Sequence, residues 1–228
     1  MRTGVFDLHS QELPLLEEVW DQYIQTGLKF GWKSNTRIEY DYGHWNKQIL
    51  SGSKIFPYDQ GKMPYIEYHP AVQKIWSIIQ DAIGERALLR AYVNGYTYGT
   101  DGYFHKDDQW IIRKFGPNTL SETIIVYLNQ NWDRDWGGET VLIDDNDEIT
   151  HALLPKFGRV FVFDSNVWHA ARPVTRACPV LRGVLVFKTI SQKILSPEVS
   201  FILEKTKGIA HSGKTFFEHL HNTFALLE

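Results

Sequence analysis

The sequence predicts a mainly β fold with flanking helices, whose body is a double-stranded β-helix of the jelly-roll, cupin-like kind. Short runs rich in Val, Ile, Phe and Tyr fill residues 87–190 and are separated by Gly, Asp, Asn or Pro turns. Segments whose apolar residues recur at helical spacing precede this region, and another follows it. Many short strands braced by helices are typical of a double-sheet jelly roll.

Two helices are expected before the β region. From Leu13 to Thr26 the apolar residues recur at the spacing of one helical face. Residues 71–83 return to that spacing, and Gly84 follows as a C-cap. Between them, residues 29–65 show no sustained period. This stretch is therefore predicted to form either irregular strands or a long loop that acts as a lid.

The predicted strands follow one another at short intervals. They are the runs ALLRAYVNGYTY, GYFHKD, TIIVYLN, ETVLID, HALLP, GRVFVFD and LRGVLVFKTI. Beyond them, a Ser-Pro start and a final run of helical spacing predict a helical C-terminus. We divide the chain into N-terminal helices with a candidate substrate lid (1–86), the β core (87–190) and a C-terminal helical extension (191–228).

Charge and cysteine content exclude several classes of protein. The chain has 24 Lys and Arg against 27 Asp and Glu, a net charge of −3, and no global electrostatic reason to bind nucleic acid or an anionic membrane. Its single cysteine, Cys178, forms neither an internal disulfide nor a multi-thiolate zinc site. Because no apolar run approaches the roughly 20 residues of a membrane span and the start lacks a signal-peptide pattern, we expect a cytoplasmic protein.

His105 and Asp107 are the first indication of a metal site. On a strand, alternation places both side chains on one face, about 7 Å apart. A carboxylate that faces the interior is costly to bury unless it is paired or bound to a cation. His169, which follows the run GRVFVFD, is available as a third ligand, and two histidines with one carboxylate form the facial triad that suits non-haem Fe(II). A salt-bridged strand surface is the alternative for the His-x-Asp pair.

Two further residues indicate an anion site. Alternation on VLRGVLVFKT places Arg182 on one face with Val184 and Val186, where a guanidinium needs an anion. On TIIVYLN the same argument places Tyr127 beside Ile125, and a hydroxyl with a guanidinium can hold one carboxylate. The alternative is an outward-facing Arg182 that pairs with a surface acid.

Four segments, taken together, resemble a known family. They are TYGTDGYFHKD (97–107), TIIVYLNQNWDRDWGGETVLI (123–143), GRVFVFDSNVWHAARPV (158–174) and LRGVLVF (181–187). In this order and spacing they resemble the 2-oxoglutarate- and Fe(II)-dependent dioxygenase superfamily, and within it the prolyl-4-hydroxylase-like branch. The likeness spans about residues 87 to 190.

The resemblance implies a role for each candidate residue. The family's iron ligands correspond to His105, Asp107 and His169. The residues that bind the distal carboxylate of 2-oxoglutarate correspond to Arg182 and Tyr127, and a tyrosine near the metal corresponds to Tyr96. Fe(II), 2-oxoglutarate and O2 are the implied cofactor and cosubstrates, with ascorbate as a candidate reductant. At the position that binds the distal carboxylate, this chain has an arginine, as in the oxygen-sensing and bacterial members that it resembles, whereas collagen-type enzymes use lysine. Because related halogenases lack the ligand carboxylate, the aspartate favours hydroxylation.

The expected function is hydroxylation of an unactivated C–H bond, coupled to decarboxylation of 2-oxoglutarate to succinate and CO2. The substrate is a peptidyl-proline or a small amino-acid-like or biosynthetic molecule, and the sequence leaves both open, as it does the oligomeric state. A non-catalytic or sensory domain that binds 2-oxoglutarate or a peptide is the alternative. A cupin with another metal and redox-neutral chemistry is a third reading, which Arg182 and Tyr127 weaken.

Three regions bear on the substrate or on a further domain. Several tryptophans lie in or beside segments expected near the mouth of the barrel, where they either form a floor on which a ligand stacks or belong to the core. They are Trp45, Trp110, Trp132, Trp136 and Trp168. The acidic stretch 133–148 either attracts a cationic substrate or is a solvated loop. The run from His211 is either a packed amphipathic helix or the start of a second domain, because it faintly resembles an HD-like metalloprotein family.

Overall fold

The computed structural model describes residues 3–33, 43–51, 69–84, 86–100, 102–107 and 120–191. Its elements are the strands β1 (Thr3–Asp7), β2 (Lys29–Trp32), β3 (His44–Ser51), β4 (Arg86–Tyr96), β5 (Ser121–Tyr127), β6 (Thr140–Ile143), β7 (Ile149–Leu153), β8 (Arg159–Asp164), β9 (Trp168–Ala171) and β10 (Arg182–Ser191), the helices α1 (Leu13–Val19) and α2 (Pro70–Ile83), and three short helical segments, η1 (Ser10–Glu12), η2 (Trp20–Gln25) and η3 (Arg134–Trp136). Trp110 and the predicted C-terminal helices lie outside the described residues. No described helix is long and apolar enough to cross a membrane.

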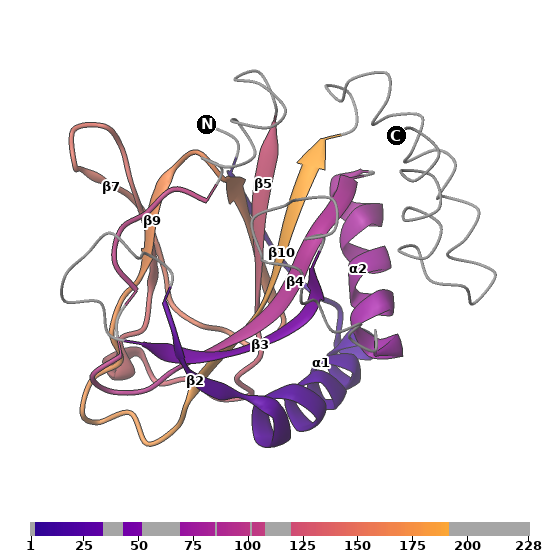
Figure 1. The fold of residues 1–228 in the computed structure, drawn as a ribbon, viewed down its shortest axis with the longest axis horizontal. Helices are drawn as coiled ribbons and strands as arrows, with labels where there is room; N and C mark the ends of the chain where they lie inside the picture. Colours follow the sequence, from indigo (N-terminus) through magenta and orange to yellow (C-terminus); the bar gives the residue numbers. More distant parts are fainter. Residues whose placement is uncertain are drawn as a thin grey trace, which may run out of the picture.

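Two antiparallel sheets form the β body. The larger has the strand order β1-β8-β5-β10-β4-β3-β2, and the smaller has the order β7-β6-β9. Figure 1 shows α1 and α2 together on one side of the larger sheet, and β7 and β9 on its other side. This arrangement confirms the predicted double-sheet β fold with N-terminal helices.

Two strands were not predicted from the sequence. Strand β1 pairs with β8 along its whole length, from Thr3 opposite Phe163 to Asp7 opposite Arg159. Strand β9 pairs with β6. Strand β1 has five residues, almost all exposed, and β9 has four. Neither shows an alternation that distinguishes it from a loop, because the partner strand, distant in sequence, determines the pairing.

The described part of the aperiodic stretch 29–65 forms strands rather than a separate layer. Strand β2 pairs with β3, and β3 pairs with β4, so both extend the larger sheet. The register shifts between Phe30 and Trp32 and again between Gln48 and Leu50. Each shift inserts an extra residue and breaks the two-residue alternation, which explains why no period is visible in the sequence.

The two predicted helices are present and cover the outer face of the larger sheet. Helix α1 continues into the π-helical turn η2, so the helical segment runs over residues 13–25. Helix α2 starts at Pro70 and ends at the predicted cap, where Gly84 has a φ of 85° and donates its N–H to the Gln80 carbonyl. Leu16, Ile75 and Ile79 pack into one apolar cluster with the outward-facing side chains of the sheet.

Strand β10 lies near the middle of the larger sheet, and its side chains alternate between two apolar clusters. Leu185 and Phe187 belong to the cluster under the helices. Val184 and Val186 belong to the cluster between the sheets, with aromatic residues of β4, β5 and β8. The same alternation places Arg182 and Lys188 on the inner face, where they line the cavity described below.

At Gly183, β10 packs closely against Trp20 of η2. A Cβ at this position would lie 2.6 Å from the Trp20 ring, whereas a Cβ at Gly4 on β1 meets nothing within 4 Å. We predict that Gly183→Ala lowers the free energy of unfolding by about 1–3 kcal/mol, because the ring must move out of its packed position. Urea unfolding, with Gly4→Ala as the matched control, measures this. Equal stability of the two variants would contradict the packing.

Candidate metal centre

The three predicted metal ligands lie together. One ligand atom each from His105, Asp107 and His169 can be chosen so that all lie within 4.8 Å of one another. His105 Nε2 is 3.6 Å from Asp107 Oδ1, and His169 Nε2 is 3.0 Å from Asp107 Oδ2. Two imidazole nitrogens and a carboxylate that converge in this way can bind a divalent metal on one face and leave its other positions open.

The segment that carries His105 and Asp107 differs from the prediction. Residues 102–107 do not form a strand but lie along β9, to which His105 is joined by an isolated β-bridge. His105 and His169 exchange two backbone hydrogen bonds of 3.0 Å, and the Asp107 N–H donates to the Ser165 carbonyl. Strand alternation is therefore the wrong reason for their convergence. The two ligands are brought together by the isolated bridge to β9 and by the turn that precedes β9, which contains Ser165.

Backbone carbonyls orient both imidazole rings. His105 Nδ1 is 2.7 Å from the Tyr103 carbonyl oxygen, and His169 Nδ1 is 2.9 Å from that of Val167. A carbonyl only accepts, so each Nδ1 carries the proton and each Nε2 presents a lone pair toward Asp107. Burial, followed by the neighbouring His169, lowers the pKa of His105 to about 3. The His105 ring is therefore neutral, as a metal ligand must be, throughout the physiological range.

The Asp107 carboxylate is held by two further side chains. Its Oδ2 accepts a 2.8 Å hydrogen bond from Thr123 and contacts the Lys188 ammonium. Lys188 also donates to Thr123 Oγ1 at 3.0 Å, and Thr123 in turn contacts Ser165. Burial and the nearby Arg90 guanidinium lower the pKa of Lys188 well below its usual value. These contacts fix the carboxylate, and they place the Lys188 amino group directly beside the metal site.

The predicted anion-binding residues meet at Thr140. The Tyr127 hydroxyl donates to Thr140 Oγ1 at 2.7 Å, and Arg182 Nη2 donates to the same oxygen at 2.9 Å. Arg182 Nε donates to the Gly138 carbonyl at 2.6 Å, which gives the Gly-Gly turn a role in orienting the guanidinium. Because Thr140 Oγ1 accepts both bonds, its own proton is available to a ligand.

Arg182 is a buried cation that faces inward. It is 1% exposed, and no ion pair among the described residues includes it. Its guanidinium carbon lies 5.3 Å from the Tyr96 ring centroid and 5.5 Å from that of Tyr127. The alternative of an outward-facing Arg182 paired with a surface acid is thus wrong. A desolvated guanidinium among aromatic rings is stabilised by an anionic ligand.

Tyr96 connects this end of the site to β3. Its hydroxyl accepts a 3.3 Å bond from Asn94, and its ring stacks on His44 with centroids 4.7 Å apart. His44 is buried, and its Nε2 has no hydrogen-bond partner among the described residues. Burial lowers the pKa of His44 to about 4, so this ring is neutral.

A single cavity joins the ligand histidines to Arg182. Its aliphatic and aromatic walls come from the inner faces of β4, β5 and β10, and the cations Arg182 and Lys188 line it as well. The described residues that line it are Tyr92, Asn94, Tyr96, His105, Thr123, Ile125, Thr140, His169, Ala171, Arg182, Val184, Val186 and Lys188. Of the six candidate residues from the sequence, the cavity is therefore lined by Tyr96, His105, His169 and Arg182. The other two contact lining residues, since Asp107 lies against His169 and Tyr127 donates to Thr140.

Sequence reasoning missed three residues of the site. Lys188 follows Val184 and Val186 on the alternation that identified Arg182, so that pattern already contained it. Thr140 and Thr123 gave no signal, because a threonine in a strand is ordinary. Their hydroxyls became recognisable only through what they contact.

Comparison with known proteins gives the same assignment. Residues 92–186 match the family model described as the 2OG-Fe(II) oxygenase superfamily, where 2OG is 2-oxoglutarate. A search of the curated proteins gives no match.

Solved structures match the fold over most of the chain. A prolyl hydroxylase from Trichoplax adhaerens, in complex with a hypoxia-inducible-factor oxygen-degradation-domain peptide, is 19% identical with a TM-score of 0.58, covering 84% of each chain. A 2OG-Fe(II) oxygenase family oxidoreductase from Burkholderia pseudomallei is 16% identical with a TM-score of 0.56, covering 82% of this chain and 84% of its own. A Pseudomonas putida prolyl-4-hydroxylase is 17% identical with a TM-score of 0.55, covering 83% and 92%.

The family match implies Fe(II), 2-oxoglutarate and O2, and the residues present fit them. The His-Asp-His cluster offers the donor set for iron, and the buried Arg182 offers the cation for a carboxylate. Residues 92–186 are thus similar to the 2OG-Fe(II) oxygenase superfamily, and the fold of the chain is similar to that of the prolyl hydroxylases.

Proposed function

We propose that this oxygenase is a hydroxylase that uses His105, Asp107 and His169 to hold Fe(II) and Arg182 to hold 2-oxoglutarate. The observation that carries the proposal is the position of Arg182. A fully buried guanidinium, without an ion pair among the described residues, lines the same cavity as two histidines whose Nε2 atoms face a carboxylate. A metal-chelating dicarboxylate satisfies both ends of this cavity at once.

Arg182 and the residues around it have different roles in binding the cosubstrate. Arg182 offers its guanidinium to the distal carboxylate, and Thr140 offers the hydroxyl proton that its two present bonds leave available. Tyr127, which is fully buried, fixes the Thr140 oxygen from behind. Tyr96 stacks against the guanidinium and lines the passage toward the histidines.

The remaining lining residues control the environment of the reaction. Fe(II), with 2-oxoglutarate and O2 bound, supplies oxidative decarboxylation to succinate and CO2 and hydroxylation of a C–H bond. Ile125, Val184 and Val186 form an apolar wall that keeps water away. Thr123 and Lys188 hold the Asp107 carboxylate in place while the metal is bound. We assign the catalytic core to residues 87–190, and we keep both peptidyl-proline and a small amino-acid-like molecule as substrate classes.

Turnover distinguishes the hydroxylase from a non-catalytic module that only binds 2-oxoglutarate. We expect the iron-loaded protein to form succinate from 2-oxoglutarate under air, and Asp107→Ala to abolish it, because the metal loses its only carboxylate ligand. Mass spectrometry of succinate measures this. Saturable binding of 2-oxoglutarate without succinate would favour the module, and full activity of an iron-loaded Asp107→Ala protein would overturn the ligand assignment.

Removal of the buried guanidinium tests the cosubstrate end of the cavity. We expect Arg182→Met to weaken 2-oxoglutarate binding to the Mn(II)-loaded protein by roughly 10- to 100-fold, because a charge-assisted hydrogen bond is lost. Anaerobic calorimetry measures the affinity. Arg176→Met, which removes an exposed guanidinium stacked on Tyr98, is the control and leaves it unchanged. Equal affinities for both variants would place the distal carboxylate elsewhere.

A further inference from the structure

The inner face of the larger sheet carries a row of three planar side chains that begins with Arg182. Arg182 on β10 is directly opposite Tyr96 on β4. On the other side of β4, Trp45 of β3 is opposite Gly95, so the preceding residue of β3, His44, comes next to Tyr96. Because β4 lies between β10 and β3, Arg182 and His44 reach Tyr96 from opposite sides.

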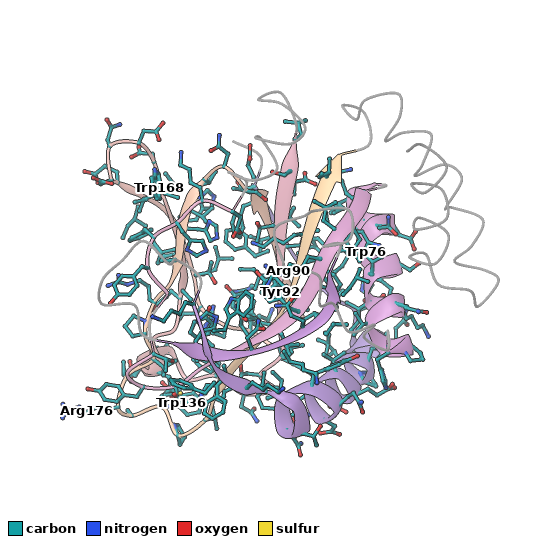
Figure 2. The ribbon with its side chains drawn as sticks, viewed as in Figure 1. Trp76, Arg90, Tyr92, Trp136, Trp168 and Arg176 are labelled. Atoms are coloured by element: carbon teal, nitrogen blue, oxygen red, sulfur yellow. The ribbon has the colours of Figure 1, made fainter. Side chains whose placement is uncertain are left out.

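Each side chain of this row contacts the next one. The Arg182 guanidinium carbon is 5.3 Å from the centroid of the Tyr96 ring, and the His44 ring stacks on the Tyr96 ring with 4.7 Å between centroids and 18° between planes. All three side chains are buried, and none is more than 5% exposed. Tyr96 is on the same face of β4 as Tyr92, which Figure 2 shows on the opposite side of the larger sheet from Trp76 of α2. The Tyr96 ring is therefore packed between an imidazole and the proposed cosubstrate-binding cation.

The Tyr96 hydroxyl is held separately from the ring. It accepts a 3.3 Å hydrogen bond from Asn94 Nδ2, and Asn94 Oδ1 accepts a 2.7 Å bond from Asn46. Burial lowers the pKa of His44 to about 4, against a hydrogen bond with Asn94 that raises it. The imidazole is thus neutral at physiological pH, and it stacks on Tyr96 without adding a like charge near Arg182.

The face of the Arg182 guanidinium is held by packing. The hydrogen bonds that its Nε and Nη2 donate lie in the plane of the guanidinium, so they limit movement within that plane. The Tyr96 and Tyr127 rings limit movement out of the plane. Of these two rings, Tyr96 is the one that His44 supports from behind. A binding group that is held in position before its ligand arrives loses less freedom on binding, and its affinity is higher.

We infer that His44 is a positioning residue for cosubstrate binding, which holds the Tyr96 ring in place and, through it, the Arg182 guanidinium. The inference rests on the proposed function and extends the site to β3, outside residues 92–186 that match the family model. His44 is not among the described residues that line the cavity. It therefore acts through Tyr96, without contact to the ligand.

The test measures the affinity of the Mn(II)-loaded protein for 2-oxoglutarate by anaerobic calorimetry. We expect His44→Ala to weaken binding by about three- to tenfold, because one contact between rings is lost. His44→Phe keeps a neutral ring behind Tyr96, so we expect an affinity within about twofold of the wild-type value. Ile49→Val is the matched control. Ile49 is fully buried on the same strand, but in the cluster under the helices, so this variant loses stability and keeps its affinity.

A double-mutant cycle shows whether His44 acts through Tyr96. Tyr96→Leu removes the ring on which His44 stacks. In that background we expect His44→Ala to change the affinity by less than about twofold, because the two residues share one effect. A residue with an independent role would cause the same loss in both backgrounds.

The outcomes separate this inference from the proposed function. A wild-type protein that does not bind 2-oxoglutarate overturns the cosubstrate assignment, and with it the inference. Normal binding by the wild type together with wild-type affinity in His44→Ala, or with an equal loss in Ile49→Val, overturns the inference alone. So does a His44→Phe protein as weak as His44→Ala, or a full effect of His44→Ala in the Tyr96→Leu background. If His44→Ala does not fold, His44→Leu fills the space without a planar ring and replaces it in each comparison.

Discussion

The alternation of side chains on β10 is the constraint on which the rest of the structure depends. This strand is covered on both faces, by the helices on one side and by the smaller sheet on the other. Its outward residues, Leu185 and Phe187, bind the helices to the β body. Its inward residues begin and end with a cation, Arg182 and Lys188, on either side of two valines. Because this strand is buried, its two charged side chains need polar or charged partners, and the residues of the site supply them.

The buried charges connect stability to ligand binding. Asp107 is held by Lys188 and Thr123, and Arg182 by Thr140 and the Gly138 carbonyl. Hydrogen bonds offset part of the cost of removing these groups from water, but a neutral partner does not cancel a net charge. The residual charge makes the site selective for ligands of opposite charge. The same preorganisation that lowers stability therefore favours binding of a metal and of carboxylates.

The sequence predicted those parts of the fold that local pattern controls. The β10 alternation identified Arg182, helical spacing located both N-terminal helices, and the glycine after α2 marked its end. The predicted convergence of His105 and Asp107 was argued from the wrong reason, strand alternation. Their segment is held by an isolated bridge to β9 rather than by a strand ladder. Strands β1, β2 and β3 depend on partners distant in sequence and on register shifts. Neither a distant partner nor a register shift leaves a local signature in the sequence. For the same reason Thr140, which receives bonds from Tyr127 and Arg182, could be found only in three dimensions.

The most direct test of the account is an anaerobic crystal structure with Mn(II) and 2-oxoglutarate, with the metal located by its anomalous scattering. The account predicts one metal ion bound by His105 Nε2, His169 Nε2 and a carboxylate oxygen of Asp107, and a distal carboxylate that accepts hydrogen bonds from Arg182 and Thr140. A metal bound elsewhere, or a distal carboxylate seated on Lys188 instead of Arg182, would contradict it.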